Sequence, residues 1–478
     1  MDLLFWTKYL VFTEWVIRLV MLPVIVLRKE KPTASLAWMS IVFFEPWIGL
    51  ALYVLIGENR LGRKRLARRR RRHAEFESAA YPDVASEHLV NPRREGEYKV
   101  LAHLAEEVGG LPIVGGNHIE FLSDTDAVIE RLVADIDAAQ RHVHLLFYIF
   151  RDDAVGRRVG EALVRARQRG VTCRVLADAV GSRAMFRRLA PHLRQHRVEV
   201  VPVLPASLWR LPFARLDLRN HRKLAVIDGQ AAYTGSQNIV EATYGHKKAG
   251  AWHDIMARIT GPAVRQLQEI FVEDWFHETG QLLEAPDLTP PCPAAGNVAL
   301  QVVPSGPDQP TEQFQDLIVK ALFLAQRRIV ITSPYFIPSE GMLLALRLAA
   351  RRGVRVELVV PLRSDHRIVD AASSYYLHYL MQFGVHVFCY DAGMLHSKTL
   401  TIDDDLAMFG SANYDVRSFD LNFELNLLLH APRAVADLHA LQTMYQAHSR
   451  PAAADDWQGR TLLGRLKVNL AKLLSPLL

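Results

Sequence analysis

The stretch from Asn220 to Asp228, NHRKLAVID, places a histidine and a lysine two residues apart at the start of an apolar run that ends in an aspartate. The run is rich in branched aliphatic residues and therefore predicts a buried strand. Residues i and i+2 of a strand point to one face, so His221 and Lys223 are expected to project together. For this segment alone, a strand with an exposed polar end is the alternative interpretation.

The same pattern returns 175 residues later, in HSKTLTID at residues 396–403. Each copy continues, after six further residues, into a Gly-Ser-x-Asn element, so H-x-K-x4-D-x6-G-S-x-N occurs twice. The candidate residues are His221, Lys223, Asp228, Ser236 and Asn238 in the first copy and His396, Lys398, Asp403, Ser411 and Asn413 in the second. Two copies of so long a pattern do not arise by chance and indicate a chain built from two related halves.

The segments around each copy alternate between expected strands and expected helices. Residues 144–150 and 166–178 frame one such unit, and residues 329–338 and 349–361 frame the other. Alternation of this kind favours a layered α/β fold, and the Pro-rich residues 284–297 read as a linker. We therefore expect two tandem α/β/α domains that form a pseudo-two-fold pair, with one active site at their interface. The expected division is 1–58 for a hydrophobic membrane hairpin, 59–115 for a basic juxtamembrane segment and linker, 116–289 and 290–450 for the two domains, and 451–478 for an amphipathic tail.

Two apolar segments precede these domains. Residues 34–56 are long enough to span a bilayer and carry one charge, Glu45. Residues 9–27 are a weaker second candidate, because they carry Glu14 and Arg18, which a helix would bring together as an i,i+4 pair. Transmembrane helices are the prediction, and buried helices of a soluble protein are the alternative.

Basic charge is concentrated just after these segments. The chain has a net charge of +6, but residues 60–72 hold nine basic residues and no acid, so the rest of the chain carries −3. The positive-inside rule predicts a cytoplasmic location for this run and for the body that follows. If both segments span the membrane, the basic 28–34 loop lies on the side opposite the cytoplasm, which conflicts with this rule. Either the first helix is re-entrant, or the larger basic cluster at 60–72 overrides the smaller one at 28–34. Anionic lipid headgroups are the expected partner of the basic run at 60–72, and the alternative is that this run is a solvated linker.

Two further features have less diagnostic value. The three cysteines are scattered, which excludes a disulfide framework or a C-x-x-C metal site and is typical of a reducing compartment. The tail has apolar residues at helical spacing, interleaved with basic ones: Leu462, Leu466, Leu470, Leu473 and Leu477. Such a helix either packs into the core or lies in a membrane interface.

Two histidines and two lysines in one pocket favour phosphoryl transfer. Lysines repel a metal cation but suit phosphoryl oxygens. One histidine can attack phosphorus and the other can serve as acid and then base. We expect the lysines, with the motif serines and asparagines, to stabilise charge on the equatorial oxygens. Asp254 and Glu424, which follow the two Gly-Ser-x-Asn elements, are the candidates to orient the histidines.

The doubled motif resembles the phospholipase D superfamily. The segments DLRNHRKLAVIDGQAAYTGSQN, ITSPYFIPSE, GMLHSKTLTID and NYDVRSFDLNFEL are similar to bacterial cardiolipin synthases of the A subtype, as are the paired N-terminal hydrophobic segments and the terminal SPLL. The resemblance covers essentially the whole chain. It implies a multi-pass enzyme of the bacterial inner membrane that transfers a phosphatidyl group between two phosphatidylglycerol molecules, releasing glycerol and needing no metal or organic cofactor. It also implies that His221 is the nucleophile, that His396 is the acid/base, and that Asp228 and Asp403 hold the halves together.

Three other functions remain open at this stage. A hydrolytic phospholipase D would differ only in using water to resolve the phospho-histidine. A nuclease of the superfamily would share the motif, but binding nucleic acid calls for a distributed basic face, and the body of this chain is mildly acidic. A non-enzymatic membrane scaffold would not need both motifs intact.

Overall fold

The computed structural model describes residues 3–28, 32–58, 61, 65–68, 86–90, 97–205, 215, 217–245, 250–283, 288–309, 312–453 and 461–473. Most of the basic run at 60–72, residues 284–287 of the expected linker and the terminal SPLL lie outside the described residues. The chain divides into two compact units, one formed by residues 1–67 with 206–218 and the other by residues 68–205 with 219–478.

The first unit contains three apolar helices: α1 (Leu3–Arg28), α2 (Pro32–Phe44) and α3 (Pro46–Ile56). Among the described residues, α1 is the one helix both long and apolar enough to cross a membrane. Within it, the expected pair of Glu14 and Arg18 forms at 3.2 Å. The segment expected to be the weaker candidate is therefore the one with the length of a membrane span.

The expectation of a single spanning helix over residues 34–56 is wrong. The helix breaks at Glu45, whose φ of −131° and ψ of 75° are not helical, and α3 restarts with Pro46. Proline disfavours the helical conformation of the residue before it, which explains the break. The two short helices then pack closely, because a Cβ atom on Gly49 would lie 2.7 Å from the Cα atom of Val42.

The pair α2–α3 lies along the second half of α1. Arg18 donates a hydrogen bond to the carbonyl of Phe43 (2.9 Å), near the turn between α2 and α3. At the other end, Arg28 forms an ion pair with Glu58 (3.0 Å). Helix α2 has 13 residues and α3 has 11, which gives lengths of about 20 and 16 Å, so neither helix alone spans a hydrocarbon layer of about 30 Å. The two contacts with α1 place the turn of this helical pair near Arg18 and both of its ends near the C-terminal end of α1.

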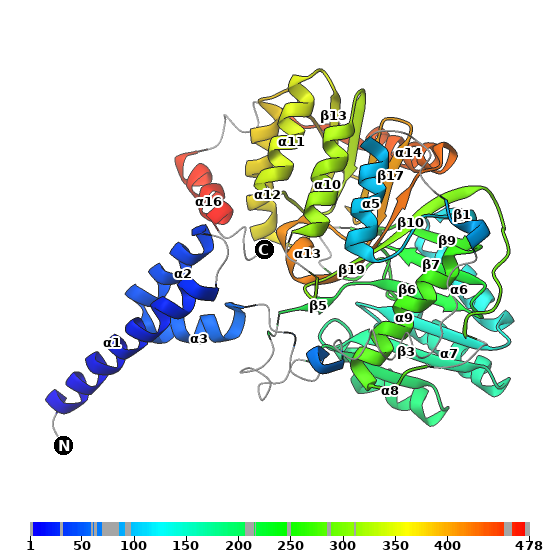
Figure 1. Cartoon of the computed structure of the whole chain (residues 1–478), viewed down its shortest axis with the longest axis horizontal. Helices are drawn as coiled ribbons and strands as arrows, with labels where there is room; N and C mark the ends of the chain where they lie inside the picture. The colour runs from blue at the N-terminus through cyan, green and yellow to red at the C-terminus, as the bar shows by residue number, and fades with distance from the viewer. Residues whose placement is uncertain are drawn as a thin grey trace. The chain divides into compact units, whose positions relative to one another are not determined.

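The second unit is built on a 16-stranded sheet (Figure 1). The first repeat supplies β1 (Val114–Leu122), β2 (His142–Phe147), β3 (Thr172–Asp178), β4 (Glu199–Val203), β6 (Lys223–Ile227), β7 (Ala231–Gly235) and β9 (Met256–Thr260). The second supplies β10 (Val298–Ser305), β11 (Arg328–Thr332), β13 (Arg355–Pro361), β14 (His386–Tyr390), β16 (Thr399–Ile402), β17 (Leu406–Gly410), β19 (Asn422–Leu429) and β20 (Ser449–Pro451). Short strands are β5 (Arg219–Asn220), β8 (Trp252–His253), β12 (Phe336–Ile337), β15 (Met394–Leu395) and β18 (Tyr414–Asp415).

Helices cover both faces of this sheet. They are α6 (Thr125–Ala138), α7 (Ala154–Gln168), α8 (Arg183–Gln195) and α9 (Ala263–Thr279) in the first repeat, and α10 (Gln313–Leu324), α11 (Glu340–Arg351), α12 (Arg367–Met381), α13 (Val416–Asp420) and α14 (Pro432–Ala447) in the second. The remaining elements are η1 (Ser86–His88), α5 (Glu97–Gly109) and α16 (Leu462–Leu473). Figure 1 shows the first repeat in cyan to green and the second in yellow to orange, side by side.

The strand order confirms the expected tandem pair. The order β1-β9-β7-β6-β2-β3-β4 in one repeat matches β10-β19-β17-β16-β11-β13-β14 in the other, and the two sheets join where β1 pairs with β10 in antiparallel fashion. One hydrophobic core is shared, since Leu267 and Phe271 of α9 belong to the same buried cluster as Leu438 and Tyr445 of α14. The opposite sheet face of each repeat has a core of its own. The two repeats therefore form one compact α/β/α body.

Candidate active site

The motif histidines lie between strands rather than on them. His221 follows β5 and precedes β6, while His396 follows β15 and precedes β16. Each short strand pairs in parallel with the other repeat: β5 with the start of β19, and β15 with β8. The backbone amide of His221 accordingly donates to the carbonyl of Phe423, and that of His396 to the carbonyl of His253, both at 2.8 Å. These two crossings bring each histidine to the other repeat.

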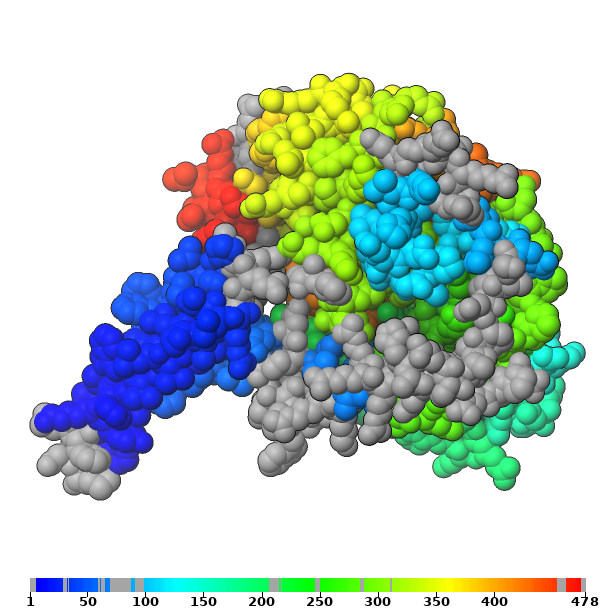
Figure 2. Space-filling view, viewed as in Figure 1, coloured from blue at the N-terminus to red at the C-terminus, as the bar shows by residue number. Residues whose placement is uncertain are grey.

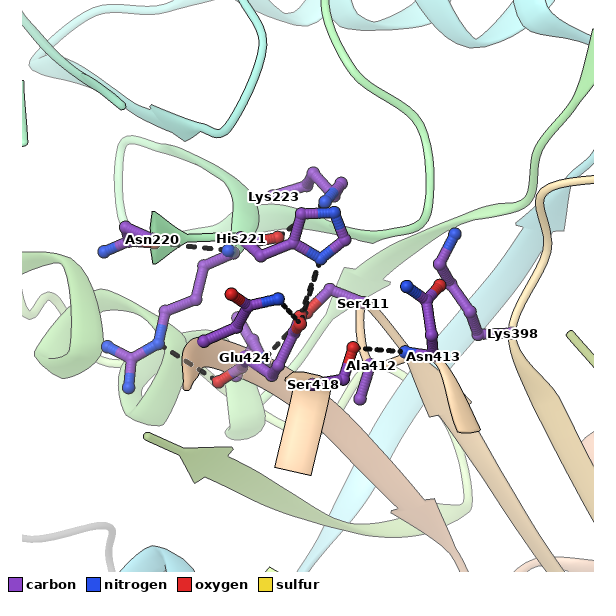
Figure 3. A network of polar contacts seen from close by, with 12 residues as sticks. Asn220, His221, Lys223, Lys398, Ser411, Ala412, Asn413, Ser418 and Glu424 are labelled. Atoms are coloured by element: carbon purple, nitrogen blue, oxygen red, sulfur yellow. Dashed lines mark hydrogen bonds and ion pairs between the residues drawn. The ribbon is translucent and has the colours of Figure 1, made fainter. Parts of the chain in front are cut away.

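Each histidine meets a carboxylate from the opposite repeat. The Nδ1 atom of His221 lies 3.0 Å from both carboxylate oxygens of Glu424, and the Nδ1 atom of His396 lies 2.6 Å from a carboxylate oxygen of Asp254. All four side chains are buried. Figure 3 shows His221 pointing at Glu424, with Ser411 beside them. Because Nδ1 is occupied in both rings, Nε2 is the nitrogen left for chemistry.

The motif lysines complete a compact group of charges. Each ammonium group donates to the carbonyl of the histidine two residues before it, Lys223 to His221 at 2.6 Å and Lys398 to His396 at 2.5 Å. Both lysines are fully buried. Two lysines and two carboxylates balance one another, so an arriving phosphodiester anion meets ammonium donors without an excess of negative charge.

Burial controls the protonation of these groups. Desolvation lowers the pKa of His221 to about 4, because it outweighs the attraction of Glu424. Desolvation and the adjacent Lys398 likewise lower the pKa of His396 to about 4. Both rings are neutral at pH 7, as a nucleophile requires. Desolvation also lowers the pKa of Lys223 to about 8.

The carboxylates remain ionised despite their burial. Burial alone raises the pKa of Asp254, but His396 and Lys398 outweigh it and bring the pKa to about 2. Burial acts on Glu424 in the same way, and His221 with Lys223 again holds its pKa below the usual value. Lys398 also acts on His221, and Lys223 on His396, so the two halves form one electrostatic site.

The motif serines serve the carboxylates. The Oγ atom of Ser236 donates to Asp254 at 2.6 Å, and that of Ser411 donates to Glu424 at 2.5 Å. Both hydroxyl protons thus point to carboxylates, whereas the sequence led us to expect these serines at the phosphoryl oxygens. The preceding glycine permits this approach, because a Cβ atom on Gly410 would lie 2.4 Å from the carbonyl oxygen of Leu425.

The motif asparagines differ from one another. The side-chain oxygen of Asn238 accepts from the backbone amide of Ile149 at 3.0 Å, which leaves its amide group near the hydroxyl of Tyr244 at 3.4 Å. In Asn413 the side-chain oxygen is buried without a hydrogen-bond partner among the described residues. Figure 3 shows Asn413 beside Lys398. The side-chain oxygen of Asn413 is thus an unused acceptor beside the site, whereas the oxygen of Asn238 is used within the fold.

The motif aspartates lie away from the histidines. The carboxylate of Asp228 accepts backbone hydrogen bonds from residues 140–142, and that of Asp403 accepts them from residues 326–328, at 2.8–3.0 Å. Both aspartates have a left-handed φ, 52° and 51°, in the turn that follows the motif strand. The motif placed them among the candidate catalytic residues, and the family resemblance implied that they hold the two halves together. Instead, each fastens the start of a neighbouring strand, β2 or β11, within its own repeat.

Several site residues were missed in the sequence. The ring of Tyr148 lies edge-on to His221, with centroids 4.8 Å apart, and Trp252 contacts His396 in the same way at 4.6 Å. Tyr148 directly follows β2, and Trp252 stands two residues before Asp254, so their positions next to the predicted elements were the available signal. Asn422, two residues before Glu424, donates to it at 3.2 Å. Within the described ranges, no group of three His, Cys, Asp or Glu side chains could hold a metal ion.

The comparisons with known proteins agree with this geometry. A family model described as "Cardiolipin synthase, PLD-like domain" matches residues 132–275 and 318–444. Cardiolipin synthase A of Yersinia pseudotuberculosis is 34% identical over 488 residues, covering 98% of each chain, and that of Erwinia tasmaniensis is 35% identical over 476 residues with the same coverage. Among solved structures, phosphatidylserine synthase from Haemophilus influenzae shares the fold, with a TM-score of 0.60, 15% identity, and coverage of 79% of this chain and 100% of that one. The chain belongs to the cardiolipin synthase family of phospholipase D-like enzymes.

Proposed function

We propose that the protein is a cardiolipin synthase that transfers a phosphatidyl group from one phosphatidylglycerol to another, giving cardiolipin and glycerol. The observation that carries the proposal is the pair of crossed histidine–carboxylate contacts, each accompanied by a buried lysine, in a family whose full-length relatives bear that name. Phospholipid substrates and membrane association follow from the family and from the apolar helix α1.

The first step uses His221 as the nucleophile. Its Nε2 atom attacks phosphorus, the bond from phosphorus to the glycerol oxygen breaks, and His396 gives that oxygen a proton. A bound phosphodiester anion beside His396 raises the pKa of this ring above its value in the empty site, which supplies the proton needed. Glu424 stabilises the positive charge that the attack places on the ring of His221.

The second step reverses the roles around the covalent phospho-histidine. The glycerol hydroxyl of another phosphatidylglycerol gives its proton to His396, its oxygen bonds to phosphorus, and the nitrogen–phosphorus bond breaks. Lys223 and Lys398 donate to the phosphoryl oxygens, with the side-chain amide nitrogen of Asn413 as a further donor. Assigning the nucleophile to His221 rather than His396 follows the family resemblance, since each histidine has a carboxylate, a lysine and an aromatic ring as neighbours.

We infer a location in the bacterial cytoplasmic membrane with a cytoplasmic body. With α1 as the single full span and α2–α3 as a re-entrant hairpin, Arg28 and the arginine-rich run that begins soon after Glu58 lie on one side. This removes the conflict with the positive-inside rule that two full spans would create. Labelling with a membrane-impermeant maleimide tests it: in spheroplasts Thr7→Cys should react, and Glu58→Cys should react only after lysis.

The reaction is tested with purified protein in micelles of detergent and phosphatidylglycerol containing EDTA. Cardiolipin and glycerol should appear in equal amounts, and His221→Ala should make neither. His386→Ala, which alters an exposed histidine on β14, is the matched control and should remain active. Phosphatidic acid in place of cardiolipin would make the protein a hydrolase, and the absence of lipid turnover would overturn the proposal.

A further inference from the structure

Helix α16 is held firmly against the body. Its residues Val468 and Ala471 are buried, and Ala471 belongs to the same apolar cluster as Ala372 of α12. The ammonium group of Lys472 lies 4.0 Å from the ring centre of Tyr375, also in α12. The side of α16 that faces the body is thus made of small side chains and one cation–π contact. Figure 2 shows α16 in red, beside the second-repeat helices in yellow.

The opposite side of α16 is a stripe of exposed leucines. Its members are Leu462 (84% exposed), Leu463 (69%), Leu466 (52%), Leu470 (54%) and Leu473 (70%). At 3.6 residues per turn these five positions fall within an arc of about 100°, centred opposite Val468. Packing of the leucines into the core, one of the two expectations from the sequence, is therefore wrong. Val468 and Ala471 pack against the body, and the larger leucine side chains point outward.

Basic residues border this leucine stripe. Arg465 and Lys467 are exposed and lie on its two sides in the helical projection. Residues 461–478 contain no aspartate or glutamate. An apolar stripe flanked by cations is typical of a helix that lies in the interface of an anionic membrane, with its apolar face in the boundary between headgroups and acyl chains. A protein partner would require no such one-sided charge.

We propose that the leucine stripe of α16 docks into the surface of an anionic bilayer and holds the active site close to it. Packed residues link the stripe to the site. Ala471 clusters with Ile337, and β12, which contains Ile337, pairs with β18, which begins directly after Asn413. The docking stands on the surface of α16 alone, whereas its consequence for turnover rests on the proposed function.

A spin label measures the docking without relying on activity. The full chain, with its three cysteines replaced by serine, carries Leu466→Cys or Leu470→Cys and is reconstituted in phosphatidylglycerol vesicles. The matched control is Leu344→Cys, a leucine 42% exposed on α11. At the α16 positions, power saturation should show high collision with oxygen and low collision with a water-soluble nickel complex. The control should show the reverse.

Two results would overturn the docking. Equal access of the nickel complex to α16 and control labels would place the stripe in water, and exclusion of both oxygen and nickel would mean that protein covers it. Vesicles of neutral phosphatidylcholine add a test of charge, since the label should sit less deeply in them.

Turnover supplies the second test. The double variant Leu466→Asp/Leu470→Asp should act on vesicle phosphatidylglycerol roughly tenfold more slowly, because charges in the stripe oppose interfacial binding. It should act normally on dihexanoyl phosphatidylglycerol dissolved below its micelle concentration, which also shows that the variant is folded. Leu344→Asp should leave both rates unchanged. An equal loss of rate on both substrates would contradict the proposal. If the aspartate variant does not fold, the milder variant Leu466→Ser/Leu470→Ser takes its place.

Discussion

Replacing Glu424 by glutamine should impair a histidine that belongs to the other repeat. Attack on phosphorus makes the ring of His221 cationic, and the carboxylate of Glu424 lies 3.0 Å from its Nδ1 atom. With the charge centred on the ring at about 4 Å and an effective dielectric constant of about 20, the stabilisation is about 4 kcal/mol. Since each 1.36 kcal/mol is about tenfold, formation of the phospho-histidine should slow by roughly a thousandfold.

The assay uses a substrate that needs no acid. Phosphatidyl-p-nitrophenol releases a leaving group that departs without a proton, so its nitrophenolate burst reports attack by His221 alone. The variant Glu424→Gln should lose this burst. The matched variant Asp254→Asn should keep the burst and then stall, because His396 can no longer accept the proton of the second alcohol. Mass spectrometry of the stalled protein should find the phosphatidyl group on the peptide that contains His221.

Two outcomes would refute this reasoning. A burst lost in Asp254→Asn and kept in Glu424→Gln, with the label on His396, would exchange the two roles. Bursts at the unsubstituted rate in both variants would mean that the crossed contacts contribute nothing to the reaction. The Gln and Asn side chains are nearly isosteric with the native ones. Both variants should therefore keep the other contacts of Glu424 and Asp254 and remain folded.

Three further predictions concern the same site. The nitrophenolate burst, which needs no acid, should slow below about pH 4, where His221 becomes protonated, and above about pH 8, where Lys223 loses its charge; the burst rate of phosphatidyl-p-nitrophenol measured across pH tests both limbs. Asp403→Asn should lower the free energy of unfolding by about 1–3 kcal/mol, because backbone amides lose an acceptor, with kcat per folded molecule unchanged; denaturant titration alongside active-site titration checks both. Ser411→Ala should slow turnover roughly ten- to hundredfold, because it removes a hydrogen bond of about 1.5–3 kcal/mol to Glu424, and Ser374→Ala on α12 is a control expected to have no effect.

The repeated motif predicted the tandem fold because its spacing is tied to strands and turns that recur in both repeats. The identity of the orienting carboxylates could also be predicted, because Asp254 and Glu424 each follow a Gly-Ser-x-Asn element, 16 and 11 residues after its asparagine. The crossing of the pairs could not. It depends on two-residue strands such as β5 and β8, which are too short to leave a periodic pattern.

Other expectations failed for local reasons. A hydroxyl such as that of Ser411 can donate to substrate or to a carboxylate, and the residue type alone does not distinguish them. The break at Glu45 did have a signal, the following proline, which outweighed the apolar composition of the segment. In α16 the leucine spacing predicted a helix with an apolar side, but not that Val468 and Ala471 would be the residues that face the body.

The crossed contacts also bear on how such a chain could have arisen. One repeat carries a histidine and a carboxylate that do not meet each other, since His221 reaches Glu424 and His396 reaches Asp254. A polypeptide with a single repeat could complete the catalytic pairs only by associating with a second copy of itself. The present arrangement thus has the form of an ancestral homodimer joined by gene duplication and fusion. Once the halves were joined, the two carboxylates could diverge into Glu424 and Asp254. A substitution in one half then changed the selection that acts on the histidine of the other half.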